Sequence, residues 1–255
     1  RGRDTWSGPG RAGPPCRSLP EGSVETSLHQ ALKAHYAEPG ARFEVPLGRY
    51  RIDVVCGDRL VEVQHGSLAA IRDKVRALLG GHAVTVVKPI IVCKQLVKLS
   101  DPGGRVESRR RSPKQGRLID VFDELVYFTR VFPHPRLTLD VPLIDVEEFR
   151  YPGHGRRRRW RRNDFVVADQ KLLAVRQTHT LRTAGDLGRL LPSGLGSPFD
   201  TGELAAALGV RRWIAQRVAY CLRKMGTVVE VGKQGNARLY QFAATGRPAA
   251  RSIPA

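Results

Sequence analysis

The chain has 255 residues, with 43 Lys and Arg against 24 Asp and Glu, which gives a formal net charge of +19 at pH 7. This length suffices for one large domain or two modest ones, and the positive balance favours a polyanionic partner, usually nucleic acid. The four cysteines are scattered without a CxxC pair, which argues against a disulfide framework and against a zinc site.

The two ends of the chain have the composition of disordered segments. Residues 1–22 are rich in Gly, Pro and Arg and are expected to form a disordered basic tail, and residues 244–255 a second disordered tail. The first of them lacks the apolar core of a signal peptide, although a chain that begins with Arg rather than Met can be a fragment. The longest apolar run, Val84 to Cys93, contains Lys88-Pro89 and is too short to span a membrane. We therefore expect a cytoplasmic protein without a membrane partner.

The first half of the chain predicts an α/β domain over residues 23–150. Its hydrophobic periodicity favours helices and strands in the order helix, three strands, helix, strand. Pro89 divides the last apolar run into two strands or a kinked one. The predicted elements are a helix from Val24 to Ala37, strands Phe43 to Leu47, Tyr50 to Val55 and Arg59 to Gln64, a helix from Leu68 to Leu79, and the run Ala83 to Val97.

Two acidic residues interrupt the strands of the predicted central hairpin. Asp53 lies in the first strand and Glu62 in the second, and the turn Cys56-Gly57-Asp58 joins them. A carboxylate within an apolar strand is costly to bury without a partner. Two carboxylates that converge form an oxygen-rich site for a hard cation such as Mg²⁺. The spacing leaves open that both are solvated charges at strand ends.

Asp53, followed by Glu62-Val63-Gln64 and a helix, resembles the PD-(D/E)XK nuclease family over about Ser23 to Val97. The resemblance implies a restriction-endonuclease-like α/β core, with a mixed sheet flanked by helices. It also implies that Asp53, Glu62 and the Val63 carbonyl hold Mg²⁺ or Mn²⁺, without a small-molecule cofactor. Glu25, on the preceding helix, would support the site or bind a second ion.

Gln64 stands where this family has a Lys that positions the attacking water. Glutamine orients a water by hydrogen bonding but carries no positive charge. Lys74 and Lys88 are candidates to supply that charge. Three hypotheses therefore stay open: a metal-dependent DNA endonuclease, a catalytically inactive nuclease-fold protein that binds DNA or regulates, and an unrelated α/β binding domain.

The segments after this core are less regular. Asp101 to Gln115 is expected to be a basic loop, Leu118 to Phe132 a helix, and Leu137 to Phe149 a pair of strands. A solvated strand face explains the acids on these strands better than a second metal site does. The acids are Asp140, Asp145, Glu147 and Glu148.

Residues 151–182 are predicted to form a basic hairpin and linker that contact nucleic acid. The alternative is an edge strand that its charge protects from aggregation. Arginines would follow the phosphates and the tryptophan would stack on bases. The residues are Arg156, Arg157, Arg158, Arg159 and Trp160.

Residues 183–243 resemble the winged helix-turn-helix fold, with short helices followed by a hairpin that turns at Gly235-Asn236. The resemblance implies that the third helix enters the major groove and that the wing contacts the DNA backbone or the minor groove. Protein docking or dimerisation is the alternative, so a homodimer stays open. The implied DNA contacts are Arg211, Arg212, Gln216, Arg217 and Arg223 on the helix, and Lys233 and Arg238 on the wing.

Overall fold

The predicted central hairpin is present. The computed structural model describes residues 26–153 and 164–244, and in it β2 (Tyr50–Cys56) pairs antiparallel with β3 (Arg59–Val63). Gly57, in the turn between them, has a positive φ of 55°, which glycine adopts at little cost. On either side, β1 (Arg42–Leu47) pairs antiparallel with β2, and β4 (Ala83–Val87) pairs parallel with β3.

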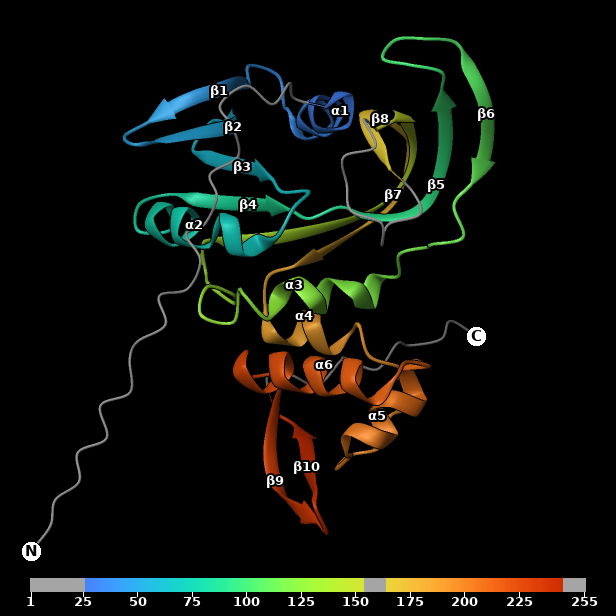
Figure 1. Ribbon diagram of the computed structural model, residues 1–255. Coiled ribbons are helices and arrows are strands. Elements are labelled where there is room, and N and C mark those ends of the chain that lie inside the picture. Colours follow the sequence, from blue (N-terminus) through green and yellow to red (C-terminus); the bar gives the residue numbers. More distant parts are fainter. Residues whose placement is uncertain (1–25, 154–163, 245–255) are drawn as a thin grey trace, which may run out of the picture.

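This hairpin belongs to an eight-stranded mixed sheet with the order β1-β2-β3-β4-β7-β5-β6, in which β8 also pairs with β7 (Figure 1). Pro89 divides the apolar run as expected, because β4 ends at Val87 and β5 (Ile90–Leu99) starts after the proline. Both strands pair parallel with β7 (Leu137–Pro152), one after the other along its length. The expected α/β class with a mixed sheet and flanking helices is therefore confirmed.

Three predictions about the later strands are wrong. The expected basic loop contains β6 (Val106–Arg111), a strand whose residues are all exposed and which forms because β5 is long enough to pair with it. The expected strand pair is the single strand β7. The described part of residues 151–182, expected to be a basic hairpin and linker, contains no separate linker: β8 (Phe165–Leu181) pairs antiparallel with β7 almost throughout, so the segment is an arm of a long hairpin within the main sheet.

Helices cover both faces of the sheet. On one face, α1 (Ser27–Tyr36) packs Leu28 and Leu32 against sheet residues that include Val54 and Val61. Thr26 caps α1, because its hydroxyl accepts a hydrogen bond from the His29 N–H. On the other face lie the short helix η1 (Leu68–Ala70) and α2 (Arg72–Leu78).

The helix expected over residues 118–132 is much shorter than predicted. It consists of η2 (Leu118–Val121) and α3 (Phe122–Leu125), followed by turns. Phe122, Phe128 and Phe132 are all almost completely buried. The turns bring all three rings into the core, and this packing outweighs the helical periodicity of the segment.

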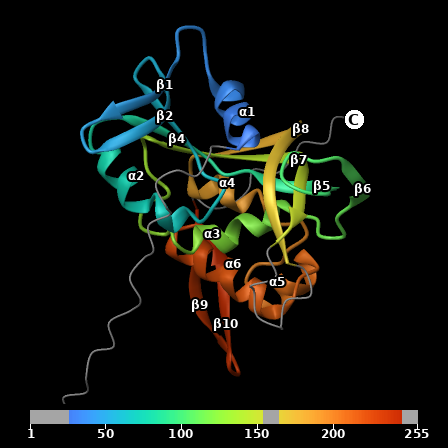
Figure 2. The same cartoon turned by 45° about the horizontal axis from the view of Figure 1, so that its top comes forward.

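The C-terminal module consists of α4 (Ala184–Gly188), α5 (Thr201–Leu208), α6 (Arg212–Lys224) and the hairpin of β9 (Val228–Gln234) and β10 (Ala237–Phe242). Asp200 caps the start of α5, and Gly209 ends it in the left-handed conformation. The module packs against α3 (Figure 2), and its apolar residues form one core with the α/β domain. The Arg117 guanidinium also joins the two parts by donating to the Leu208 carbonyl at 2.7 Å.

None of the helices in the described ranges is long and apolar enough to cross a bilayer.

Candidate active site

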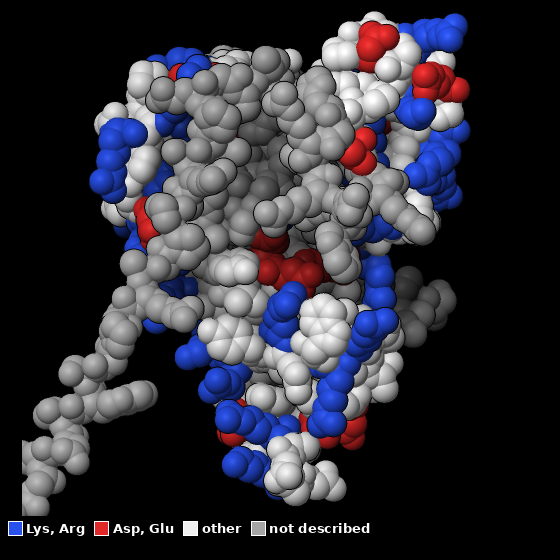
Figure 3. Space-filling model, in the orientation of Figure 1, with Lys and Arg blue, Asp and Glu red and all other residues white. Residues whose placement is uncertain are grey.

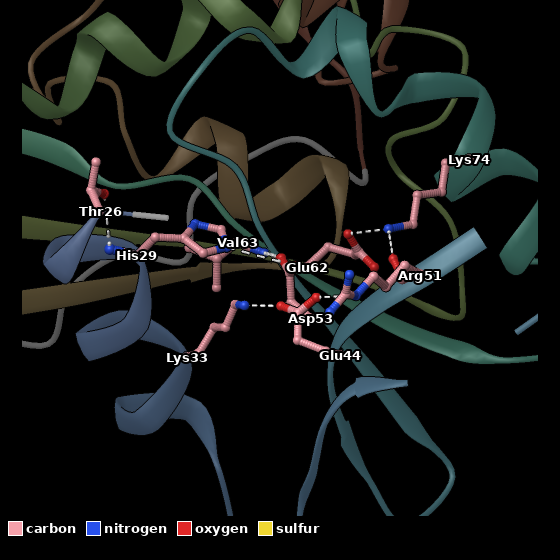
Figure 4. A network of polar contacts seen from close by, with 9 residues as sticks. All are labelled: Thr26, His29, Lys33, Glu44, Arg51, Asp53, Glu62, Val63 and Lys74. Carbon is pink, nitrogen blue, oxygen red and sulfur yellow. Dashed lines mark hydrogen bonds and ion pairs between the residues drawn. The ribbon is translucent and has the colours of Figure 1, made fainter. Parts of the chain in front are cut away.

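The structure brings Asp53 of β2 and Glu62 of β3 together on two neighbouring strands of the sheet. Val54 of β2 faces Val61 of β3, so the register places the two acids one step further along the same pair of strands. The Asp53 carboxylate accepts a hydrogen bond of 2.8 Å from the Val63 N–H, and His29 Nε2 lies 3.6 Å from its other oxygen (Figure 4). Burial raises the pKa of Asp53, but the contacts with His29 and Val63 outweigh it and hold this pKa below its usual value.

Glu62 is almost completely buried, with 3 % of its surface exposed. Its Oε2 accepts a hydrogen bond of 2.6 Å from Lys74 Nζ, whereas Oε1 is buried without a hydrogen-bond partner among the described residues. Burial raises the pKa of Glu62 to about 7, and the charge of Asp53 adds to this effect, whereas Lys74 opposes it. Glu62 therefore combines an ion pair through one oxygen with a second, buried oxygen that has no hydrogen-bond partner among the described residues.

The lysine beside the two acids is Lys74 of α2. Its Nζ contacts Glu62 and also donates to the Arg51 carbonyl (Figure 4). Lys88, the other sequence-based candidate, lies elsewhere: it donates to the His65 carbonyl at 3.0 Å and to the Gly66 carbonyl, and lies 3.8 Å from Glu124. Of the two lysines, Lys74 is the one that contacts Glu62.

Val63 at the end of β3 and Gln64 directly after it form hydrogen bonds that involve the backbone. The Gln64 side-chain amide donates to the Ser67 carbonyl at 2.9 Å, and its backbone N–H donates to the Val87 carbonyl. The Val63 N–H is the donor to Asp53. A role for Gln64 in orienting water, and for the Val63 carbonyl as a metal ligand, stays a prediction.

The oxygen ligands that Asp53 and Glu62 offer are of the kind that a hard divalent cation prefers. Asp53 and Glu62 supply carboxylate oxygens, and Glu62 Oε1 has no hydrogen-bond partner among the described residues. Across residues 26–153 and 164–244, no cluster of three or more His, Cys, Asp and Glu residues has metal-binding geometry. Glu25, the expected third acid, lies outside the described residues.

The sequence did not predict a third carboxylate, that of Glu44, beside Asp53 and Glu62. Glu44 of β1 contacts both Lys33 of α1 and Arg51 of β2 (Figure 4). The spacing of His29 and Lys33 places both on one face of α1, and this pattern could have indicated basic residues beside the site.

Burial lowers the pKa of His65 to about 4, so this ring, whose centroid lies 5.4 Å from that of His29, is neutral at pH 7.

The four acids of β7, which the sequence assigned to a solvated strand face, each form polar contacts with other side chains. They are not simply solvated, because each has a polar partner on another strand of the sheet. The contacts are Asp140 with Thr180, Asp145 with Arg176, Glu147 with Arg109, and Glu148 with Lys94, Arg150 and Gln170.

Of the predicted DNA contacts on α6 and the wing, two form ion pairs within the protein and most of the others are exposed to solvent. Arg217 forms an ion pair with Asp123 of α3, and Arg238 forms one with Glu230. Arg211, Arg212, Gln216 and Lys233 are exposed, and Arg223 is half-buried. The predicted contacts in the basic segment, Arg156, Arg157, Arg158, Arg159 and Trp160, lie outside the described residues.

The fold is thus an α/β domain with paired carboxylates on a mixed sheet, joined to a small helical module with a β-hairpin. Residues 26–182, from α1 to the end of β8, match the DUF8091 family, described as a domain of unknown function, and the chain belongs to this family. It is also 32% identical, over 220 residues that cover 85% of both chains, to an uncharacterized protein of Treponema pallidum (strain Nichols). No solved structure matches the chain.

The raised pKa of Glu62 predicts a stability that depends on pH. Between pH 4.5 and about 7 the folded protein retains a proton on Glu62 that the unfolded chain releases, so this residue lowers stability as pH rises through that range. We expect the free energy of unfolding of Glu62→Gln, relative to the unmutated protein, to increase by on the order of 1–3 kcal/mol between pH 5 and pH 8. Urea denaturation in EDTA measures this difference, and a difference that does not change with pH would contradict it.

Proposed function

We propose that this protein is a metal-dependent DNA endonuclease, which hydrolyses phosphodiester bonds at Asp53, Glu62 and Lys74. The observation that carries the proposal is the contact between Lys74 and Glu62 beside Asp53. It puts a lysine next to the two acids although the sequence has Gln64 at the position of the family's lysine. A positive charge at this point is what the resemblance to PD-(D/E)XK nucleases requires and Gln64 lacks.

The topology supports the same proposal. The order α1, β1, β2, β3, α2, β4, with three antiparallel strands followed by one parallel strand, agrees with a restriction-endonuclease-like core. Both acids lie on the middle strands of this arrangement. The helices α1 and α2 supply the basic residues around them, from opposite faces of the sheet.

Each residue has a distinct role in the proposed reaction. Mg²⁺ or Mn²⁺ held by Asp53 and Glu62 would supply positive charge against the phosphate and activate water for in-line attack. The Lys74 ammonium, which contacts Glu62, would stabilise the negative charge that develops on the phosphate. Gln64 and Lys88 position the loop after β3, through Ser67 and through the His65 and Gly66 carbonyls. Hydrolysis joins the water oxygen to phosphorus and releases one DNA end as an alcohol.

The C-terminal module supports DNA as the substrate. Its helices, the isolated bridge between Phe199 and Tyr240, and its hairpin follow the order of a winged helix-turn-helix domain. Residues 211–224 contain five basic residues and no acid. Lys and Arg side chains are spread over this module in the lower half of Figure 3. A surface with this charge favours contact with phosphates.

The exposed face of α6 gives a test of this module. Replacing Arg212 and Gln216 together with Ala should weaken DNA binding by about 5- to 10-fold and reduce the dependence of log Kd on log salt by about one. Fluorescence anisotropy with a labelled duplex measures both quantities. Arg189→Ala is the matched control, because Arg189 is an exposed arginine of the same module that pairs with Asp186. Equal effects of the two changes would contradict a specific role for α6.

Cleavage of supercoiled plasmid and of single-stranded DNA, with Mg²⁺, with Mn²⁺ and with EDTA, tests the whole proposal. Metal-dependent cleavage supports the nuclease. Salt-sensitive binding without any cleavage would instead favour a DNA-binding protein on an inactive nuclease fold.

A further inference from the structure

Arg51 forms an ion pair with Glu44 at the edge of the candidate active site. Arg51 precedes Asp53 by two residues on β2, and its backbone carbonyl accepts a hydrogen bond from Lys74. The register of β1 and β2, in which Phe43 faces Val54 and Val45 faces Ile52, places Glu44 opposite Asp53. This ion pair therefore adjoins both acids and the lysine of the site (Figure 4).

Glu44 has an unusual backbone conformation. Among the described residues it is the non-glycine residue with a positive φ, 54°, although it lies within strand β1. L-amino acids other than Asn and Asp rarely adopt this left-handed conformation, and it persists where surrounding contacts enforce it, often at functional sites. Here the contacts are with Lys33 and Arg51, so the conformation serves to place the Glu44 carboxylate between two cations.

The two cations differ in their access to solvent. The Lys33 side chain is 4% exposed, whereas the Arg51 side chain is 72% exposed. One carboxylate thus faces two positive charges, and the exposed guanidinium can exchange its partner at little cost, because exposed ion pairs contribute little to stability. A guanidinium also binds phosphate through two parallel hydrogen bonds, the geometry it uses with a carboxylate.

We propose that Arg51 binds a phosphate of the DNA strand that enters the candidate active site, and that Glu44 holds its guanidinium in the free protein. This inference rests on the proposed function, since it names a substrate contact of the same site. When DNA binds, a phosphate takes the position of the Glu44 carboxylate at Arg51, while Glu44 keeps its contact with the buried Lys33.

The first test is DNA binding by Arg51→Gln, measured in EDTA by fluorescence anisotropy with a short labelled duplex at several salt concentrations. We expect about tenfold weaker binding, the order for loss of one charged hydrogen bond, and a salt dependence reduced by about one. Arg49→Gln is the matched control: Arg49 is exposed in the same hairpin, but its guanidinium donates to the Tyr50 hydroxyl and lies over that ring. Equal affinities for the two variants would overturn the inference.

The second test separates Arg51 from a general effect of charge. Glu44→Gln frees the guanidinium, so it should tighten DNA binding by about threefold or more in the presence of Arg51 and have no such effect in the Arg51→Gln background. A gain of equal size in both backgrounds would overturn the inference, because it would reflect only the lost negative charge. Both tests are binding measurements, so absence of cleavage would defeat the proposed nuclease activity without deciding the role of Arg51. Absence of DNA binding by the unmutated protein would defeat both.

Discussion

Replacing Asp53 with Asn is expected to lower the rate of metal-dependent DNA cleavage by about 10³-fold or more, and Glu62→Gln should do the same. Each change removes one of the two negative charges that would hold the cation, while it keeps the size of the side chain and a carbonyl oxygen for hydrogen bonding. Asn at position 53 still accepts from the Val63 N–H, so the hairpin should keep its structure. Cleavage of plasmid under single-turnover conditions measures the loss.

Asp58→Asn is the matched control for these changes. Asp58 is an exposed acid in the turn of the same hairpin, and its replacement alters the net charge by the same amount. It should cleave DNA at close to the unmutated rate, and all three variants should bind DNA in EDTA. Full cleavage by Asp53→Asn would exclude the proposed site, even if the protein proved to be a nuclease.

Lys74→Met should reduce cleavage by about 10²- to 10³-fold, because it removes the positive charge beside the phosphate. It should also move the remaining activity to higher pH. Lys74 lowers the pKa of Glu62, so without it Glu62 stays protonated to a higher pH and holds a cation less well there. The pH dependence of the cleavage rate distinguishes this expectation from a loss of folding, which would lower activity equally at every pH.

Arg76→Met provides the comparison on the same helix. Arg76 is an exposed basic residue of α2 that pairs with Asp73, away from the two acids. Its replacement should leave both the rate and the pH profile unchanged. If the two variants lost activity to the same extent, the role of Lys74 would be a general contribution of positive charge rather than its contact with Glu62.

The parts of the site that were predictable depend on local pattern. Asp53 and Glu62 lie on strands joined by a short turn, so alternation and the turn residues suffice to bring them together. Pro89 marks a strand break because it lacks an N–H for the sheet. Lys74 was one of two candidates, and only the packing of α2 on the sheet shows that it contacts Glu62.

The parts that were not predictable depend on distant partners. Every residue of β6 is exposed, so it shows no alternation, and it forms a strand only because β5 extends beside it. The contact of Glu44 with Lys33 and Arg51 requires the register of β1 against β2 and the position of α1. The turns after α3 form because Phe128 and Phe132 pack into a core whose other side is the C-terminal module.

That shared core has a consequence for how the protein would choose a bond to cut. α3 contacts α6 through Asp123 and Phe122, and its Glu124 accepts a hydrogen bond of 2.8 Å from the Leu68 N–H, close to the loop after β3. A DNA-binding module on a flexible linker would allow a range of cleavage positions. The C-terminal module instead packs against the α/β domain. If α6 binds DNA and the proposed site cleaves it, breaks should fall at one fixed distance from the sequence or structure that α6 contacts.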